Sequence, residues 1–269
     1  MTILLKKVVL GLVPLSGLVL ESCASQPGAP KIQRSVKQFS PNFSVVQSVV
    51  SAPLDKSNPV SIRSSNVSAA SALGDAYYNG SGVPQDYSTA AIWYSLAASH
   101  DDLVSEYHLA VMYSAGLGVQ RNNSKAFYWF NKAAHSGNVA AELAIAEAYA
   151  NGEGVGQDQK KASYWYKKAA DSGNVTAQTK IALRYADGIG IKKNQHIAKQ
   201  YFHEAASKGD PVAELNLGNF FQKGVAVHEN AAQAVFWWMQ SAKQGNSEAQ
   251  NALAGSVRGR GGLLGRVTV

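Results

Sequence analysis

The aromatic, small and glycine positions of this chain recur every 36 residues from about Ala69 to Asn246. Two aromatic series show the period: Tyr77, Tyr113, Tyr149, Tyr185 and Phe221, and then Trp93, Trp129, Trp165, Tyr201 and Trp237. A fixed period of this length indicates a solenoid, in which each unit buries its apolar face only against its neighbours. The pattern predicts five units near 69–102, 103–138, 139–174, 175–210 and 211–246, followed by a half-unit at 247–254.

Each unit contains two stretches with helical spacing. In the third unit Ala141, Ile145 and Tyr149 fall on one stripe of a helix, and in the second unit Ala126 and Phe130 do the same. The pattern therefore predicts an all-α protein built from helix pairs. We also expect the repeated aromatics to fill the gaps between units, so that Trp165 lies between the third and the fourth.

A Gly-x-Gly-Val loop separates the two helices of each unit, as at Gly116 to Val119. Its glycines suit the positive φ of a tight turn. Asp or Asn follows six residues after the first glycine, and both are strong helix N-caps. The predicted N-caps of the second helices are Asp86, Asn122, Asp158, Asn194 and Asn230. These helices are expected to end before Gly137, Gly173, Gly209 and Gly245.

Two residues depart from the period. Asp101 stands where later units have the terminal glycine, so we expect the first turn between units to differ. Ala226 replaces the second loop glycine in the fifth unit. If that position needs a positive φ, alanine there costs about 1 kcal/mol.

Three motifs resemble the Sel-1-like repeat family, a relative of the tetratricopeptide repeat. They are Leu-Gly-x-x-Tyr-x-x-Gly-x-Gly-Val at 73–83, Ala-x-x-Trp-Tyr at 90–94, and Ala97-Ala98, and the resemblance covers residues 69–254. It implies a right-handed α-solenoid of five helix-turn-helix repeats plus a C-terminal half-repeat helix, with a concave groove that binds other proteins. It also implies a bacterial protein that is exported or lipid-anchored and takes part in envelope assembly, signalling or host interaction.

By analogy with tetratricopeptide repeats, the first helix of each unit is expected to line the groove. The candidate partner-binding residues are those that break the repeat on this helix: Asp75, Tyr78, Tyr107, Val111, Ser114, Leu143, Glu147, Thr179, Leu183 and Asn219. Tyr78 and Tyr107 are possible anchors for a peptide or helix. The alternative is that several of these residues only pack on neighbouring helices.

The N-terminus is typical of an export signal. Lys6 and Lys7 precede an apolar run that is too short to span a bilayer, and residues 1–22 fit a signal peptide. Leu20-Glu21-Ser22-Cys23 resembles a bacterial lipobox, although Glu21 departs from it. This predicts a lipid on Cys23 and an outer membrane lipoprotein that faces the periplasm or the surface. The alternative is ordinary cleavage after Ala24, which gives a soluble periplasmic or secreted protein.

Residues 23–68 are rich in Ser and Pro and are expected to form a disordered tether, while residues 255–269 are expected to form a disordered Gly/Arg-rich tail. The formal net charge is +7, but residues 69–254 carry 15 basic and 16 acidic groups, so the flanks hold the positive charge. A nucleic-acid-binding protein would concentrate that charge on its folded surface, so no nucleic-acid partner is expected.

Catalytic and metal-binding patterns are missing from the sequence. The chain has one cysteine, and its six histidines show no metal-ligand spacing. No Gly-x-Ser-x-Gly, Ser-x-x-Lys or phosphate-binding loop occurs. We therefore expect a non-enzymatic scaffold for a protein partner, without cofactor or metal. The alternative is an envelope hydrolase or penicillin-interacting, β-lactamase-like protein, an activity credited to a cysteine-rich subclass whose cysteines this chain lacks.

Overall fold

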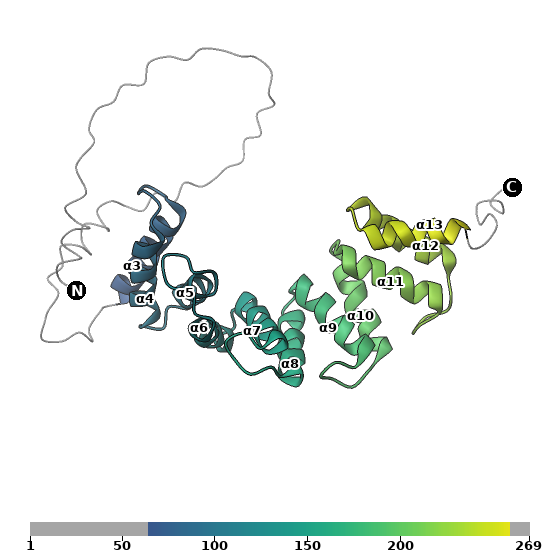
Figure 1. Cartoon of the computed structure of the whole chain (residues 1–269), viewed down its shortest axis with the longest axis horizontal. Coiled ribbons are helices and arrows are strands. Elements are labelled where there is room, and N and C mark those ends of the chain that lie inside the picture. The colour runs from purple at the N-terminus through teal and green to yellow at the C-terminus, as the bar shows by residue number, and fades with distance from the viewer. Residues whose placement is uncertain (1–63, 259–269) are drawn as a thin grey trace, which may run out of the picture. The chain divides into compact units, whose positions relative to one another are not determined.

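The computed structural model describes residues 64–258, and all the regular elements in this range are α-helices (Figure 1). They form five helix pairs and a final single helix: α3 (Ser64–Asn79) with α4 (Tyr87–Ala98), α5 (Leu103–Ala115) with α6 (Asn123–His135), α7 (Val139–Asn151) with α8 (Gln159–Asp171), α9 (Val175–Asp187) with α10 (Gln195–Ser207), α11 (Pro211–Lys223) with α12 (Ala231–Lys243), and α13 (Ser247–Arg258). Cys23, the expected signal peptide, most of the expected tether and residues 259–269 lie outside the described residues.

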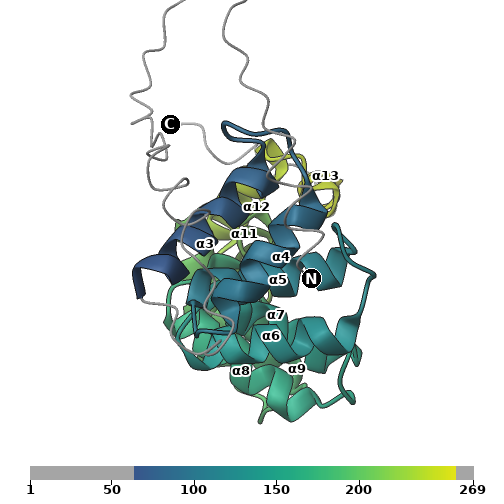
Figure 2. The same ribbon diagram turned by 90° about the vertical axis from the view of Figure 1, so that its left-hand side faces the viewer.

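Each helix packs against the next one along the chain. The two helices of a pair contact each other, and the second helix of a pair contacts the first helix of the following pair. Figure 2 views the same row from the end that carries α3 and α4. This order of contacts confirms the predicted all-α solenoid.

The two ends of the repeat region extend further than expected. Helix α3 begins at Ser64, upstream of Ala69, because Pro59 is the last helix-breaking residue before it. Helix α13 continues through Gly255 to Arg258, beyond the expected end at 254. A single glycine costs a helix interior only about 1 kcal/mol and does not by itself end the helix.

Every predicted N-cap of a second helix is confirmed. In the first pair, the Asp86 carboxylate accepts hydrogen bonds from the backbone N–H groups of Ser88 and Thr89 at 2.9 and 3.1 Å. The caps on the other second helices are Asn122, Asp158, Asn194 and Asn230. The first helices of the second to fifth units are also capped, by Asp102, Asn138, Asn174 and Asp210. The downstream end of each loop that leads into these helices is therefore held by local hydrogen bonds.

Asp101 and Ala226 both adopt the left-handed conformation, with φ values of 62° and 57°. The expectation of a different turn at Asp101 was therefore wrong in its main point, because the aspartate takes the same backbone region as Gly137 and Gly173. The expected positive φ at Ala226 is confirmed. Helix α4 does end at Ala98, one residue earlier in the period than α6, which ends at His135.

Alanines and repeated aromatics make up the core, which is divided into three clusters along the row. The expected place of Trp165 between the third and fourth units is corrected by its contacts. Its ring lies edge-on to the ring of His135 on α6, with centroids 5.3 Å apart. Lys168, three residues after Trp165, also reaches back to the Ala134 carbonyl at 3.5 Å. These two side chains of α8 thus lie against the end of the second helix of the preceding unit.

Candidate protein-binding surface

The ten expected binding residues lie on the first helices of their units. On α5, the spacing of Tyr107, Val111 and Ser114 places them on one helix face. Five of the ten residues occupy the same place in successive repeats and form one column: Asp75, Val111, Glu147, Leu183 and Asn219. Glu147 is exposed, Thr179 is buried at 5% exposure, and the others are half-buried. We therefore assign Thr179 to packing within the protein and not to the binding surface.

Three expected residues of the first two units belong to one aromatic cluster. The Tyr94 hydroxyl donates to Asp75 Oδ1 at 2.7 Å. The His108 ring stacks on the Tyr94 ring, with centroids 5.0 Å apart and an interplanar angle of 9°. Tyr78 and Tyr107 both contact the His108 ring, with centroids 5.6 and 5.8 Å apart. Sequence reasoning missed Tyr94, which reads as core, and His108, which belongs to no motif.

The cluster is electrically neutral at its centre. Burial lowers the pKa of His108, and this outweighs the opposing effects of Asp75 and Asp102. Burial and the hydrogen bond to Asp75 raise the pKa of Tyr94. His108 Nε2 lies 4.0 Å from Asp75 Oδ1, and the Asp75 side chain is half-exposed. The cluster therefore presents neutral rings beside one accessible carboxylate at neutral pH.

The same column touches second-helix aromatics in later units. The Trp238 indole N–H donates to Asn219 Oδ1 at 3.1 Å. Burial, and then the charge of Glu147, raise the pKa of Tyr166 to about 12. Partial burial raises the pKa of Glu147 itself, against the opposing charge of Lys180. Asp75 and Asn219 thus already hold hydrogen bonds within the chain, which leaves Glu147 the most accessible member of the column.

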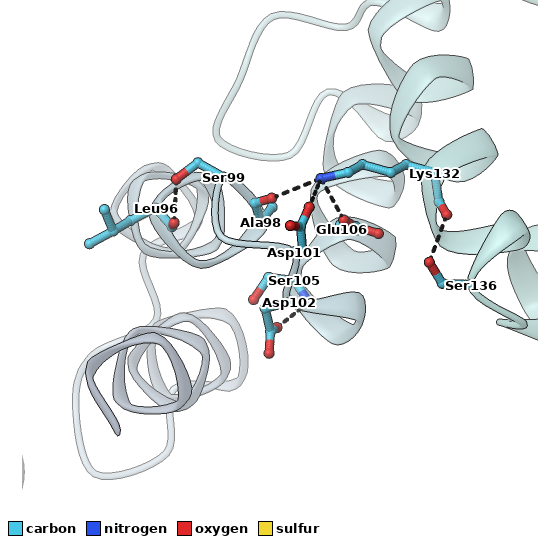
Figure 3. A network of polar contacts seen from close by, with 9 residues as sticks. All are labelled: Leu96, Ala98, Ser99, Asp101, Asp102, Ser105, Glu106, Lys132 and Ser136. Atoms are coloured by element: carbon cyan, nitrogen blue, oxygen red, sulfur yellow. Dashed lines mark hydrogen bonds and ion pairs between the residues drawn. The ribbon is translucent and has the colours of Figure 1, made fainter. Parts of the chain in front are cut away.

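A buried acid and a lysine connect the two helices of the second and third units. Glu106, only 1% exposed, lies with Oε1 2.8 Å from Lys132 Nζ, and Glu142 pairs with Lys168 at 2.9 Å. Figure 3 shows that Lys132 also reaches Asp101 at 2.6 Å and the Ala98 carbonyl at 3.4 Å. One ammonium therefore joins the end of α4, the start of α5 and the last turn of α6. This network fixes neighbouring helices and has a structural role.

A second periodic series lies on the second helices, one position before the aromatic series of Trp93 to Trp237, which is half-buried except for the buried Trp165. Tyr128 and Tyr164 are 60% and 64% exposed, and Ile92 and Phe236 are exposed at the equivalent positions. The fourth unit has Gln200 there. These residues were not singled out from the sequence, although their 36-residue spacing was available. They are not needed by the core.

Among residues 64–258, no helix combines the length and the hydropathy needed to cross a membrane. The same residues contain no group of three His, Cys, Asp or Glu side chains placed to hold a metal ion.

Comparisons with known proteins agree with the repeat. The Sel1 repeat matches residues 67–102, 103–138, 139–174, 175–210 and 211–246. The chain is similar to the crystal structure of a protective antigen of uropathogenic Escherichia coli that displays an SLR fold. The two are 36% identical with a TM-score of 0.69, over 73% of this chain but 42% of that one. A Sel1 repeat protein from Oxalobacter formigenes is 33% identical with a TM-score of 0.66, over 71% of this chain and 78% of that one. No curated protein matches the chain.

Proposed function

Because the chain belongs to the Sel1 repeat family, whose members are generally protein-interaction scaffolds, we propose that it is a non-enzymatic adaptor that binds a partner protein along its first helices. The observation that carries this proposal is the column formed by Asp75, Val111, Glu147, Leu183 and Asn219. The core alanines recur from unit to unit, while this column changes between acidic, apolar and amide side chains.

The repeated residues of a solenoid are committed to packing against their neighbours. Selectivity for a partner must therefore come from positions at which the units differ. The column offers acidic groups in the first and third units and apolar groups in the second and fourth. Tyr78 and Tyr107 border it at one end, and half-buried rigid rings give contact area at a low cost in conformational entropy.

The same proposal includes a place in the cell envelope. Export and lipid attachment at Cys23 are supported by the apolar run and the lipobox-like residues before it. Acyl chains stabilise membrane binding by about 0.8 kcal/mol per buried methylene, so two or three chains anchor a protein firmly. The similarity to a protective antigen supports a role at a surface that meets a host. Mass spectrometry of the mature N-terminus tests the anchor, since an unmodified Ala24 or Ser25 would contradict it.

Crosslinking in cells tests the binding face. The full chain is compared with a variant that carries Val111→Lys and Glu147→Lys, both on partly or fully exposed positions of the column. Lysine keeps its methylene stem on the helix surface and its charge in water, so the fold is expected to survive. Lys192→Glu in an exposed loop is the control for a change of charge. Loss of the crosslinked partner in the column variant alone is expected, and equal capture by both variants would contradict the proposal.

A further inference from the structure

A cleft of about 420 Å³ lies between α8, α9 and α10, and none of the five column residues lines it. Its lining residues are Lys167, Ala170, Asp171, Gln178, Tyr185, Ile197, Gln200, Tyr201 and Glu204. Its volume falls within the range of about 300–1,000 Å³ that is usual for ligand pockets. Nothing in the proposed function uses this cleft.

The cleft exists because the fourth unit departs from its neighbours. Between the second and third units, the Trp165 ring lies against His135 and the Lys168 ammonium reaches the Ala134 carbonyl. One repeat later, Tyr201 replaces the tryptophan and Glu204 replaces the lysine. A smaller ring and a shorter side chain leave space at this junction. The lysine charge is also reversed.

The walls of the cleft combine apolar, aromatic and acidic groups. Ile197 is half-buried and supplies aliphatic surface, while Ala170 is only 1% exposed. The Tyr185 and Tyr201 rings are nearly parallel, with an interplanar angle of 10° and centroids 6.2 Å apart. The Tyr201 hydroxyl donates to Asp171 Oδ1 at 2.6 Å, which holds the ring in place.

The charges of the cleft leave one carboxylate without a cation. Asp171 is neutralised by Lys167, whose Nζ lies 2.5 Å from Oδ2. Glu204 Oε2 accepts a hydrogen bond from the Gln178 amide at 2.9 Å, and no Lys or Arg between residues 66 and 256 forms an ion pair with it. The side-chain oxygen of Gln178 in turn accepts a hydrogen bond from Lys208 Nζ at 3.2 Å. Lys208 does not line the cleft. The lining residues therefore carry a net charge of −1.

We propose that this cleft binds the side chain of an arginine from a partner protein. The methylene stem of an arginine fits the half-buried aliphatic surface of Ile197. Its planar guanidinium can stack on a tyrosine ring and donate to the open oxygen of Glu204. Lysine shares the charge but lacks the planar group, so arginine binds more tightly. The inference deepens the proposed function, because the arginine is supplied by a bound protein.

A tripeptide titration followed by NMR tests the cleft without the partner. The probe is acetyl-Gly-Arg-Gly-amide, and its citrulline counterpart has nearly the same shape without the charge. Because one side chain supplies little binding energy, we expect millimolar affinity for the arginine peptide and no saturable binding of the citrulline peptide. The shifted resonances should belong to residues of α8 and α10. We expect Glu204→Gln to weaken binding about tenfold, the equivalent of ~1.4 kcal/mol.

A second variant fills the cleft with side chains that the chain already uses. Tyr201→Trp with Glu204→Lys reproduces Trp165 and Lys168 of the third unit, so it should fold, and it should lose the peptide. Absence of saturable binding, equal binding of the citrulline peptide, or full binding by Glu204→Gln would overturn the inference. Peptide binding by the Val111→Lys and Glu147→Lys variant is expected to be unchanged. The peptide titration therefore tests the cleft, and the crosslinking experiment tests the column, independently of each other.

Discussion

The Gln244 amide donates a hydrogen bond to Glu214 Oε2 at 2.9 Å, and no lysine between residues 66 and 256 pairs with this buried carboxylate. Glu106 and Glu142, at the same place in earlier repeats, each pair with a lysine. The fourth unit has Gln178 there, which donates to Glu204. One buried position thus changes from an ion pair in the second and third units to a hydrogen bond between an amide and a carboxylate in the fourth and fifth.

Glu214 is expected to make the stability of the last repeat depend on pH. It is 4% exposed, and burial raises its pKa above the ordinary value of 4.5, against the hydrogen bond from Gln244. A raised folded-state pKa means that the folded protein binds the proton more tightly than the unfolded chain. The ionised carboxylate therefore destabilises the fold above the raised pKa, and this effect disappears as the pH falls to about 4.5.

Thermal melts across this pH range check the effect. Glu214→Gln should raise the Tm at pH 7 and should leave it unchanged below the ordinary pKa of glutamate. Glu106→Gln is the matched control, since it removes the partner of Lys132 and should lower the Tm at pH 7. A lower Tm for Glu214→Gln at pH 7 would show that the charge of this carboxylate is stabilising.

Lys168 is expected to contribute far more to stability than its neighbour Lys167. Lys168→Met leaves the buried carboxylate of Glu142 without a cation, at a cost of about 2–4 kcal/mol. Lys167→Met breaks an exposed pair with Asp171 and should cost less than about 1 kcal/mol. Glu142→Gln added to Lys168→Met should recover most of the loss. Equal Tm values for the two single variants would contradict the structural role of the buried pair.

Arg184 is buried, and no carboxylate among residues 64–258 forms an ion pair with it, so its removal should cost little. Its guanidinium donates to Gln159 Oε1 at 2.9 Å and to Ser163 Oγ at 3.1 Å, and it lies over the Tyr166 ring. Met112 fills the equivalent position of the second unit, so Arg184→Met has a precedent in the chain. Because the cost of burying the charge offsets the gain from the hydrogen bonds, we expect the free energy of unfolding of Arg184→Met to lie within about 1 kcal/mol of that of the unchanged protein. A loss above about 3 kcal/mol in denaturant melts would show that the guanidinium network is strongly stabilising.

The local part of the fold was predictable from the sequence. Caps such as Asp86 and turn glycines depend on residues a few positions away, and the period repeats the same signal five times. Contacts between units were harder to infer. Glu106 is a charged residue at a helical position, so nothing in the pattern marks it as buried beside Lys132. Trp165 was placed at the wrong junction because periodicity marks a residue as core without identifying the neighbour that it faces.

The binding face was predictable only as a set of variable positions. The sequence indicated Asp75 and Tyr107, yet the hydrogen bond from Tyr94 depends on how two helices of one unit pack, and the stacked His108 depends on how two units pack. The first contact joins residues 19 positions apart, and the second joins residues 14 positions apart. A pattern within one helix carries no information about them.

The loop glycines give a graded test of how tightly successive units pack. Gly82, Gly154 and Ala226 occupy the same loop position and all have a positive φ. A Cβ at Gly154 would lie 2.1 Å from the Asn123 carbonyl oxygen at the start of α6, whereas a Cβ at Gly82 meets nothing within 4 Å. Gly154→Ala therefore adds a clash with the preceding unit to the backbone strain, while Gly82→Ala adds the strain alone.

The expected costs follow this order. Gly82→Ala should lower the unfolding free energy by about 1 kcal/mol, and Gly154→Ala by about 2–4 kcal/mol. Ala226→Gly should raise it by about 0.5–1 kcal/mol, because relief of the strain exceeds the added chain entropy. Denaturant melts of the three variants measure these changes. Equal losses for Gly82→Ala and Gly154→Ala would mean that the loop backbone and the start of α6 in the preceding unit do not approach closely, because only that contact distinguishes the two positions.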